Sequence, residues 1–217
     1  MKKLDRIFFF VGVGMFISEL WKQWYLTFVI NDGCYDWWYF PFQLCSLPMY
    51  ILVFLPWIKN IKIKQELITF LMDFNLLGGI FAFADTSGMH YVSPWLTAHS
   101  ILWHLLLITI GMAAGILGSC EPSWKTFLHS IIIYGICCTM ATIFNLSFNS
   151  FGHINMFYIN PYISMDQVVF QNLTAVFGNG TAIIAYILAT ILGAALIHSL
   201  WMEKYLQVNS VTASKEI

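Results

Sequence analysis

Residues 41–48, Pro-Phe-Gln-Leu-Cys-Ser-Leu-Pro, lie inside an apolar run that extends from Trp38 to Ile58. The run is long enough to cross a bilayer, and it holds an amide, a thiol and a hydroxyl between two prolines. Prolines inside a membrane-spanning helix are tolerated where neighbouring helices or side chains satisfy the backbone carbonyls that they free. The stretch therefore predicts a polar site that is buried within a membrane-embedded bundle.

The composition supports a membrane protein. Of the 217 residues, 59% are hydrophobic and only 10% are charged, whereas a soluble domain carries roughly 25% charged residues. The net charge of −1 gives no attraction to nucleic acid, so we expect no nucleic-acid partner. The five cysteines form no C-x-x-C pair, which excludes a typical zinc site or disulfide framework. We expect no metal and no cofactor.

Apolar runs of about 20 residues predict six membrane-spanning helices. They cover approximately Ile7–Ile30, Trp38–Trp57, Leu67–Ala84, Trp95–Leu117, Trp124–Leu146 and Thr181–Trp201. The connections are short except for the polar and aromatic segment from Ser147 to Gly180. Because no repeat or linker interrupts the chain, we predict an all-α, polytopic bundle of six helices that forms a single integral membrane domain over residues 1–217.

The distribution of basic residues predicts the orientation. Nine of them lie on one side of the predicted spans: Lys2, Lys3, Arg6, Lys59, Lys62, Lys64, Lys125, Lys204 and Lys215. The three opposite segments, Asn31–Asp36, Asp85–Pro94 and Ser147–Gly180, contain no Lys or Arg. By the positive-inside rule, the sequence predicts a multi-pass protein of the cell membrane with both termini in the cytoplasm.

Several polar side chains are predicted to share one layer of the membrane. Cys45 lies seven residues below Trp38, roughly 10 Å along a helix, and His104 lies nine residues below Trp95, roughly 13 Å. The same counting gives a layer somewhat above the midplane that contains Glu19, Lys22, Gln43, Cys45, His99, His104 and Asn145. Asp73 is nearer the cytoplasmic side.

The chemistry of this layer has more than one interpretation. Glu19 and Lys22 are three residues apart on one helix face, so they form either a structural pair or a site that holds an anionic headgroup or orients a histidine. His104 shares a face with Thr97 and Ser100, whereas His99 points about 140° away. His129 and His198 lack a polar face and are predicted to be incidental. Cys45 is either a small buried hydrophobe or a nucleophile whose proton an imidazole removes.

Three segments resemble a known family. Leu44-Cys45-Ser46 after Pro41, the stretch from Ala98 to His104, and the amide-rich segment from Asn145 to Tyr158 are similar to the YwaF-like bacterial integral membrane proteins. Animal transmembrane protein 164 is a distant relative of that family. This relative implies a phospholipid acyltransferase that uses a cysteine and a histidine, which correspond here to Cys45 as acyl acceptor and His104 as its base. The sequence departs from the family at Gln43, where many relatives have a histidine.

The leading hypothesis is therefore a membrane-embedded acyltransferase or lipid-acyl hydrolase that acts on phospholipid of the outer leaflet. Cys45 and His104 would be catalytic, and amides of Gln43, Asn145 or Asn149 would stabilise the oxyanion. One alternative is a small transporter or ion-coupled carrier with a polar path through Glu19, Lys22, Asp73 and His104. Another is a lipid-binding or assembly factor without catalysis. The sequence does not indicate an oligomeric state.

Overall fold

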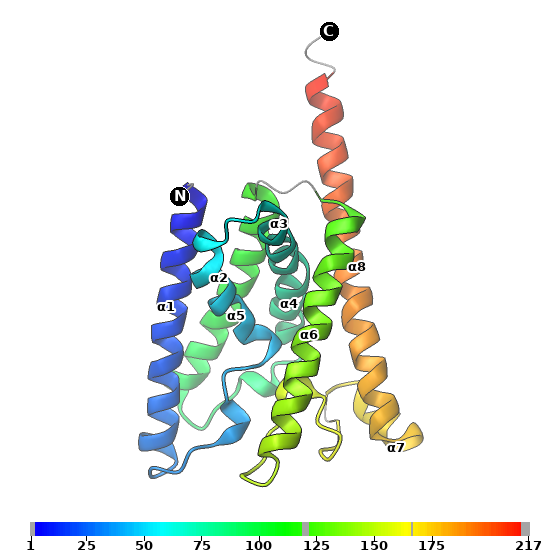
Figure 1. Cartoon of the computed structure of the whole chain (residues 1–217). Helices are drawn as coiled ribbons and strands as arrows, with labels where there is room; N and C mark the ends of the chain where they lie inside the picture. Colours follow the sequence, from blue (N-terminus) through cyan, green and yellow to red (C-terminus); the bar gives the residue numbers. More distant parts are fainter. Residues whose placement is uncertain (1–2, 119–121, 166, 214–217) are drawn as a thin grey trace.

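The computed structural model describes residues 3–118, 122–165 and 167–213, and these residues contain helices and connections but no strand. Eight α-helices follow the chain: α1 (Lys3–Tyr25), α2 (Leu47–Phe54), α3 (Ile61–Phe70), α4 (Leu76–Ala84), α5 (Pro94–Leu117), α6 (Trp124–Phe148), α7 (Phe170–Phe177) and α8 (Asn179–Ala213). A π-helical turn, Leu26–Ile30, prolongs α1, and another, Leu71–Asn75, joins α3 to α4 without a break. The protein is thus the all-α membrane protein that its apolar runs predict (Figure 1).

The predicted count of six spans is not confirmed. Four helical stretches of the described chain are long and apolar enough to cross a membrane: Ile61–Ala84, Pro94–Leu117, Trp124–Phe148 and Asn179–Gln207. The helical part of the second predicted span is shorter, Leu44–Trp57. The first span is a long helix, but Glu19 and Lys22 lie in its interior and lower its hydropathy.

The surface of the bundle is apolar along its long helices. On α8, the residues Ile184, Leu188, Leu192, Leu196 and Leu200 recur every four positions and are all more than half exposed. A spacing of four residues places them on one helical face. A continuous exposed stripe of this length would be a liability in water, but it is the expected outer face of a helix in lipid.

Close helix packing holds the bundle together. A Cβ added at Gly12 of α1 would lie 2.8 Å from the Cβ of Leu52 on α2, and one added at Gly111 of α5 would lie 2.7 Å from the Cβ of Leu76 on α4. Glycines at these points let the backbones approach, as small residues do in membrane bundles. The buried side chains form two apolar clusters, one around Leu52 and Leu107 and the other around Phe74 and Tyr134.

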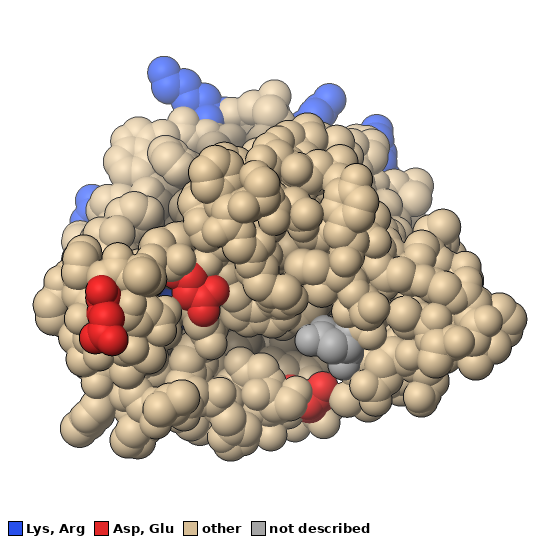
Figure 2. Space-filling view, turned by 90° about the horizontal axis from the view of Figure 1, so that it is seen from below, with Lys and Arg blue, Asp and Glu red and all other residues tan. Residues whose placement is uncertain are grey.

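The basic segments gather at one end of the bundle. The N-terminus, the connection between α2 and α3, the connection between α5 and α6, and the C-terminal part of α8 all lie at the top of Figure 1. The opposite end, seen in Figure 2, carries acidic side chains and a hollow, and most of the Lys and Arg visible in that view project beyond its margin. Lys2 and Lys215 lie outside the described residues. Which side of the membrane each end faces stays a prediction.

Candidate functional site

The stretch from Pro41 to Pro48 is not the interior of a helix. The backbone is irregular up to Gln43, forms a 3₁₀ turn over Leu44–Ser46, and then enters α2, where Pro48 is in the first turn. Proline suits the first turn because its missing N–H would have no helical partner there. The depth of about 10 Å predicted for Cys45 assumed a continuous helix, and this assumption was wrong.

Two hydrogen bonds from neighbouring helices hold this irregular segment. The Tyr50 hydroxyl of α2 donates to the Pro41 carbonyl at 2.9 Å, and the Trp103 indole N–H of α5 donates to the Cys45 carbonyl at 3.0 Å. Backbone carbonyls outside a regular helix need such partners within a membrane protein. The Trp103 bond fixes the main chain at Cys45 against α5.

A cavity of about 580 Å³ lies beside this segment, in the half of the bundle away from the termini. It is lined by six of the seven residues of the predicted polar layer: Glu19, Lys22, Gln43, Cys45, His99 and His104. Asn145 and Asn149 do not line it. The cavity thus gathers side chains from α1, the segment before α2, and α5, whereas Asn145 of the predicted layer does not line it.

Glu19 and Lys22 form an ion pair at the wall of the cavity. Lys22 Nζ lies 2.8 Å from Glu19 Oε1, and both side chains are largely buried. The Gln23 amide also donates to Glu19 Oε1 at 2.7 Å and to the Tyr39 carbonyl at 2.6 Å. Both partners of the Glu19 carboxylate therefore come from its own helix, as is usual for charged groups that face the interior of a membrane bundle.

His104 has a defined tautomer. Its Nδ1 lies 2.8 Å from the Ser100 carbonyl, and a carbonyl can only accept, so the neutral ring carries its proton on Nδ1. Its Nε2 then has the free lone pair that a general base needs. The Ser100 carbonyl lies one helical turn before His104, so α5 orients the ring by itself.

His99 of the predicted layer lines the cavity as well, although it lies about 140° from His104 around the axis of α5. Its Nε2 lies 2.8 Å from the Ser18 hydroxyl of α1, and its ring stacks on that of Trp103 with centroids 5.6 Å apart. The cavity is lined by residues of α1 and α4 as well as of α5, so it can contact more than one face of α5. The angular separation of the two histidines is therefore compatible with a shared site.

Two of the amides that were predicted to stabilise an oxyanion form hydrogen bonds with the main chain of residues 155–157. Gln43 Nε2 donates to the Asn155 carbonyl at 2.9 Å, and its Oε1 accepts from the Phe157 N–H at 2.6 Å. Asn145 is fully buried; its Nδ2 donates to the Met156 carbonyl at 3.0 Å, and its Oδ1 accepts from the Met156 N–H at 2.6 Å.

Asn149 is exposed, and its Oδ1 accepts from Asn160 at 3.3 Å. Phe157 has a φ of 58°, a left-handed conformation that is rare for a bulky residue. The amides of Gln43 and Asn145 therefore fix a strained turn, Met156–Tyr158, over the cavity.

The comparisons with known proteins agree with this architecture. A family model described as the TMEM164 family matches residues 1–202. The chain belongs to the TMEM164 family. The expected relation to animal transmembrane protein 164 is confirmed at this level, whereas the match does not bear on the YwaF-like name. No curated protein and no solved structure matches the chain.

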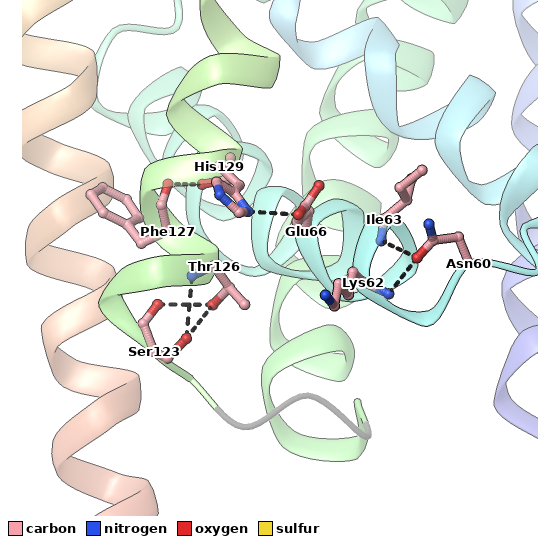
Figure 3. A network of polar contacts seen from close by, with 9 residues as sticks. Asn60, Lys62, Ile63, Glu66, Ser123, Thr126, Phe127 and His129 are labelled. Carbon is pink, nitrogen blue, oxygen red and sulfur yellow. Dashed lines mark hydrogen bonds and ion pairs between the residues drawn. The ribbon is translucent and has the colours of Figure 1, made fainter.

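The described part of this TMEM164-family chain also contains two histidine–carboxylate pairs that the sequence did not predict. His198 Nδ1 of α8 lies 2.8 Å from Asp73 Oδ2 in the π-helical turn, and both side chains are 0% exposed. His129 Nδ1 of α6 lies 2.6 Å from Glu66 Oε1 of α3, near the basic end (Figure 3). Each pair joins segments far apart in the chain, so helical spacing could not reveal it.

Neither pair lines the cavity. Among the described residues, no group of three or more His, Cys, Asp or Glu side chains could hold a metal ion. Cys137 and Cys138 lie on α6 away from the cavity. Cys45 is thus the cysteine that meets the cavity within the described chain.

Proposed function

We propose that this TMEM164-family protein transfers acyl chains between lipids, with Cys45 as the nucleophile and His104 as its base. One observation carries the proposal: the thiol-bearing residue and a histidine with an available Nε2 line the same cavity in a membrane-embedded bundle. An imidazole that accepts the thiol proton gives the thiolate, which is the nucleophilic form of cysteine.

The reaction that we propose has two steps. In the first, His104 Nε2 takes the Cys45 proton, and the sulfur attacks the ester carbonyl carbon of a phospholipid. The ester C–O bond breaks, the leaving oxygen takes the proton from His104, and a lysolipid leaves while Cys45 carries a thioester. In the second, His104 removes a proton from the hydroxyl of an acceptor lipid or of water, this oxygen takes the acyl group, and the proton returns to Cys45.

We propose that Lys22 stabilises the negative charge of the substrate or of the oxyanion that forms during the reaction. An ammonium has three N–H donors, and one contacts Glu19. Lys22 can therefore also bind a lipid phosphate or the oxyanion that forms at the ester carbonyl. Such fixed donors are effective where water is excluded. Because the Gln43 amide already bonds Asn155 and Phe157, we propose that Gln43 shapes the cavity rather than binds the oxyanion.

A reconstituted assay tests the proposal. The purified full chain is placed in phosphatidylcholine vesicles that contain a phospholipid with an isotope-labelled acyl chain and an unlabelled lysolipid acceptor. We expect labelled acceptor or labelled fatty acid to form with the wild type and to fall to background with Cys45→Ser. Cys137→Ser, a half-buried cysteine of α6 outside the cavity, is the matched control and retains activity.

The same assay separates the alternatives. A lipid-binding factor without catalysis would give no product in any variant. Transfer that persists in Cys45→Ser would rule out the thiol as nucleophile. The transport alternative relied on a polar path that includes Asp73, but this side chain is 0% exposed, bonds His198, and does not line the cavity. No specific observation therefore favours transport as a second function.

A further inference from the structure

The cavity has two unlike halves. Toward α1 and α5 it is lined by the charged and polar groups of the candidate site, such as Lys22, Cys45 and His104. Toward α4 and α8 its lining is mainly apolar or small: Leu77, Gly78, Phe81 and Ala82 from α4, Tyr186 and Ala189 from α8, Val168 and Val169 before α7, and Phe170 at the start of α7. A ligand that fits both halves has a polar part and a hydrocarbon part.

The apolar half opens sideways rather than only toward the outer end. Phe81 of α4 is 63% exposed and Ala189 of α8 is also exposed, yet both line the cavity. Ala189 lies ten residues beyond Asn179, the first residue of α8, or about 15 Å along the helix axis. In a bilayer this depth is hydrocarbon, so the opening between α4 and α8 meets lipid chains.

Contacts of two glycines show where this opening ends. A Cβ added at Gly193 of α8 would lie 2.9 Å from Leu77 Cδ1, so α4 and α8 touch at this level. One residue after Leu77, a Cβ added at Gly78 would meet only Leu44 Cδ2, at 3.9 Å, within 4 Å. Gly78 therefore borders open space next to the contact between Leu77 of α4 and Gly193 of α8.

We propose that an acyl chain of a membrane phospholipid enters the cavity between α4 and α8 and lies against Gly78, with its ester carbonyl toward Cys45. This inference rests on the proposed function and adds to it the path of the substrate. The occupant follows from the chemistry of the walls, since the apolar half opens at hydrocarbon depth and the other half presents Lys22 to an anionic headgroup. Gly78 is then a specificity-determining residue, because a side chain there would occupy the space of the chain.

Photocrosslinking tests the proposed path. The full chain is reconstituted in phosphatidylcholine vesicles that contain a phosphatidylcholine with a diazirine in its acyl chain, and adducts are mapped by peptide mass spectrometry after illumination. Adducts at Phe81 and Tyr186 are compared with those at Ile136, an exposed residue of α6 that reports ordinary contact with bulk lipid. We expect the cavity residues to be labelled in excess of Ile136.

Two glycine variants provide a matched comparison. Gly78→Phe should lower the adducts at Tyr186 by about tenfold, which corresponds to a loss of roughly 1.4 kcal/mol in binding. Gly135→Phe on α6, where an added Cβ meets nothing within 4 Å, should leave them unchanged. If Gly78→Phe does not fold, Ala189→Trp at the exposed mouth serves in its place and should give the same loss.

The result that overturns the inference is labelling of Tyr186 no stronger than that of Ile136, or labelling insensitive to both the Gly78 and Ala189 variants. Such a result would show that the acyl chain binds elsewhere, or that another molecule occupies the space between α4 and α8. Cys45→Ser should retain full labelling because the chain binds without reacting. If the cavity residues are labelled but the wild type transfers no acyl chain, the proposed function is refuted and the proposed path of the chain is not. The failure of the path and the failure of the function can therefore be told apart.

Discussion

At the scale of single residues, the candidate site depends on which nitrogen of a histidine is free. The Ser100 carbonyl holds the Nδ1 proton of His104, which leaves Nε2 to accept a proton. His99 instead uses its Nε2 to contact Ser18. Both rings line the cavity, but only His104 has the nitrogen arrangement of a base that its own helix orients.

Substitution of the two histidines should therefore have unequal effects. We expect His104→Ala to lower acyl transfer in the vesicle assay by about 10²–10⁴-fold, the usual contribution of general acid–base catalysis. His99→Ala, which removes a stacking and hydrogen-bonding ring, should change the rate by less than about tenfold, since it leaves the base in place. The opposite order would make His99 the base and contradict the assignment of His104.

The residue-scale predictions from the sequence succeeded where the partners are near in the chain. The spacing of Glu19 and Lys22 predicted that they can pair, and they do. Sequence spacing could not predict partners that are remote in the chain. His198 and Asp73 are 125 positions apart, and a helical wheel does not relate α8 to the π-helical turn between α3 and α4. The amides of Gln43 and Asn145 share this limit, because their partners lie more than one helical turn away in an irregular segment.

At the scale of elements, the buried Asp73–His198 pair joins the π-helical turn Leu71–Asn75 to α8. His198 stacks on Phe127 with centroids 4.9 Å apart, so the pair lies in an apolar setting. A buried pair contributes little relative to well-packed apolar residues, but the removal of one partner leaves an uncompensated polar group.

We expect Asp73→Leu to destabilise the protein by roughly 3–5 kcal/mol, measured as chemical unfolding in detergent micelles. The double variant Asp73→Leu/His198→Phe should recover most of this loss, because no buried polar group remains unpaired. Strictly additive losses in the single and double variants would show that the two side chains do not depend on each other.

The prolines show how far element boundaries could be predicted. Pro48 and Pro94 lie in the first turns of α2 and α5, where proline costs no hydrogen bond. The apolar run around Pro41 predicted a continuous helix because hydropathy does not distinguish a helix from an irregular segment that neighbours satisfy. Tyr50 and Trp103 supply those partners, and their contacts depend on the tertiary fold.

At the scale of the whole molecule, hydropathy predicted the fold class correctly and the number of spans less well. The predicted runs Leu67–Ala84, Trp95–Leu117, Trp124–Leu146 and Thr181–Trp201 lie within the four long apolar helices of the described chain. The first part of the second run is not helical, because it forms the irregular segment at the cavity wall. The departures from a regular bundle therefore coincide with the candidate site, where ordinary local rules are least informative.

The orientation can be tested with a native cysteine. Cys34 is exposed in the connection that follows α1, at the end of the bundle opposite the termini. If that end faces outward, a membrane-impermeant maleimide added to intact cells should label the protein, and Cys34→Ser should abolish the signal. Labelling of Cys34 only after permeabilisation would reverse the predicted orientation.

The central claim is that Cys45 carries the acyl chain during the reaction. The most direct measurement is mass spectrometry of the wild-type protein after incubation in vesicles with an isotope-labelled phospholipid and no acceptor. We predict a labelled acyl adduct on Cys45 that hydroxylamine removes, as it does a thioester, and that Cys45→Ser lacks. Acyl transfer by the wild type without any adduct on Cys45, and equally by Cys45→Ser, would contradict the account.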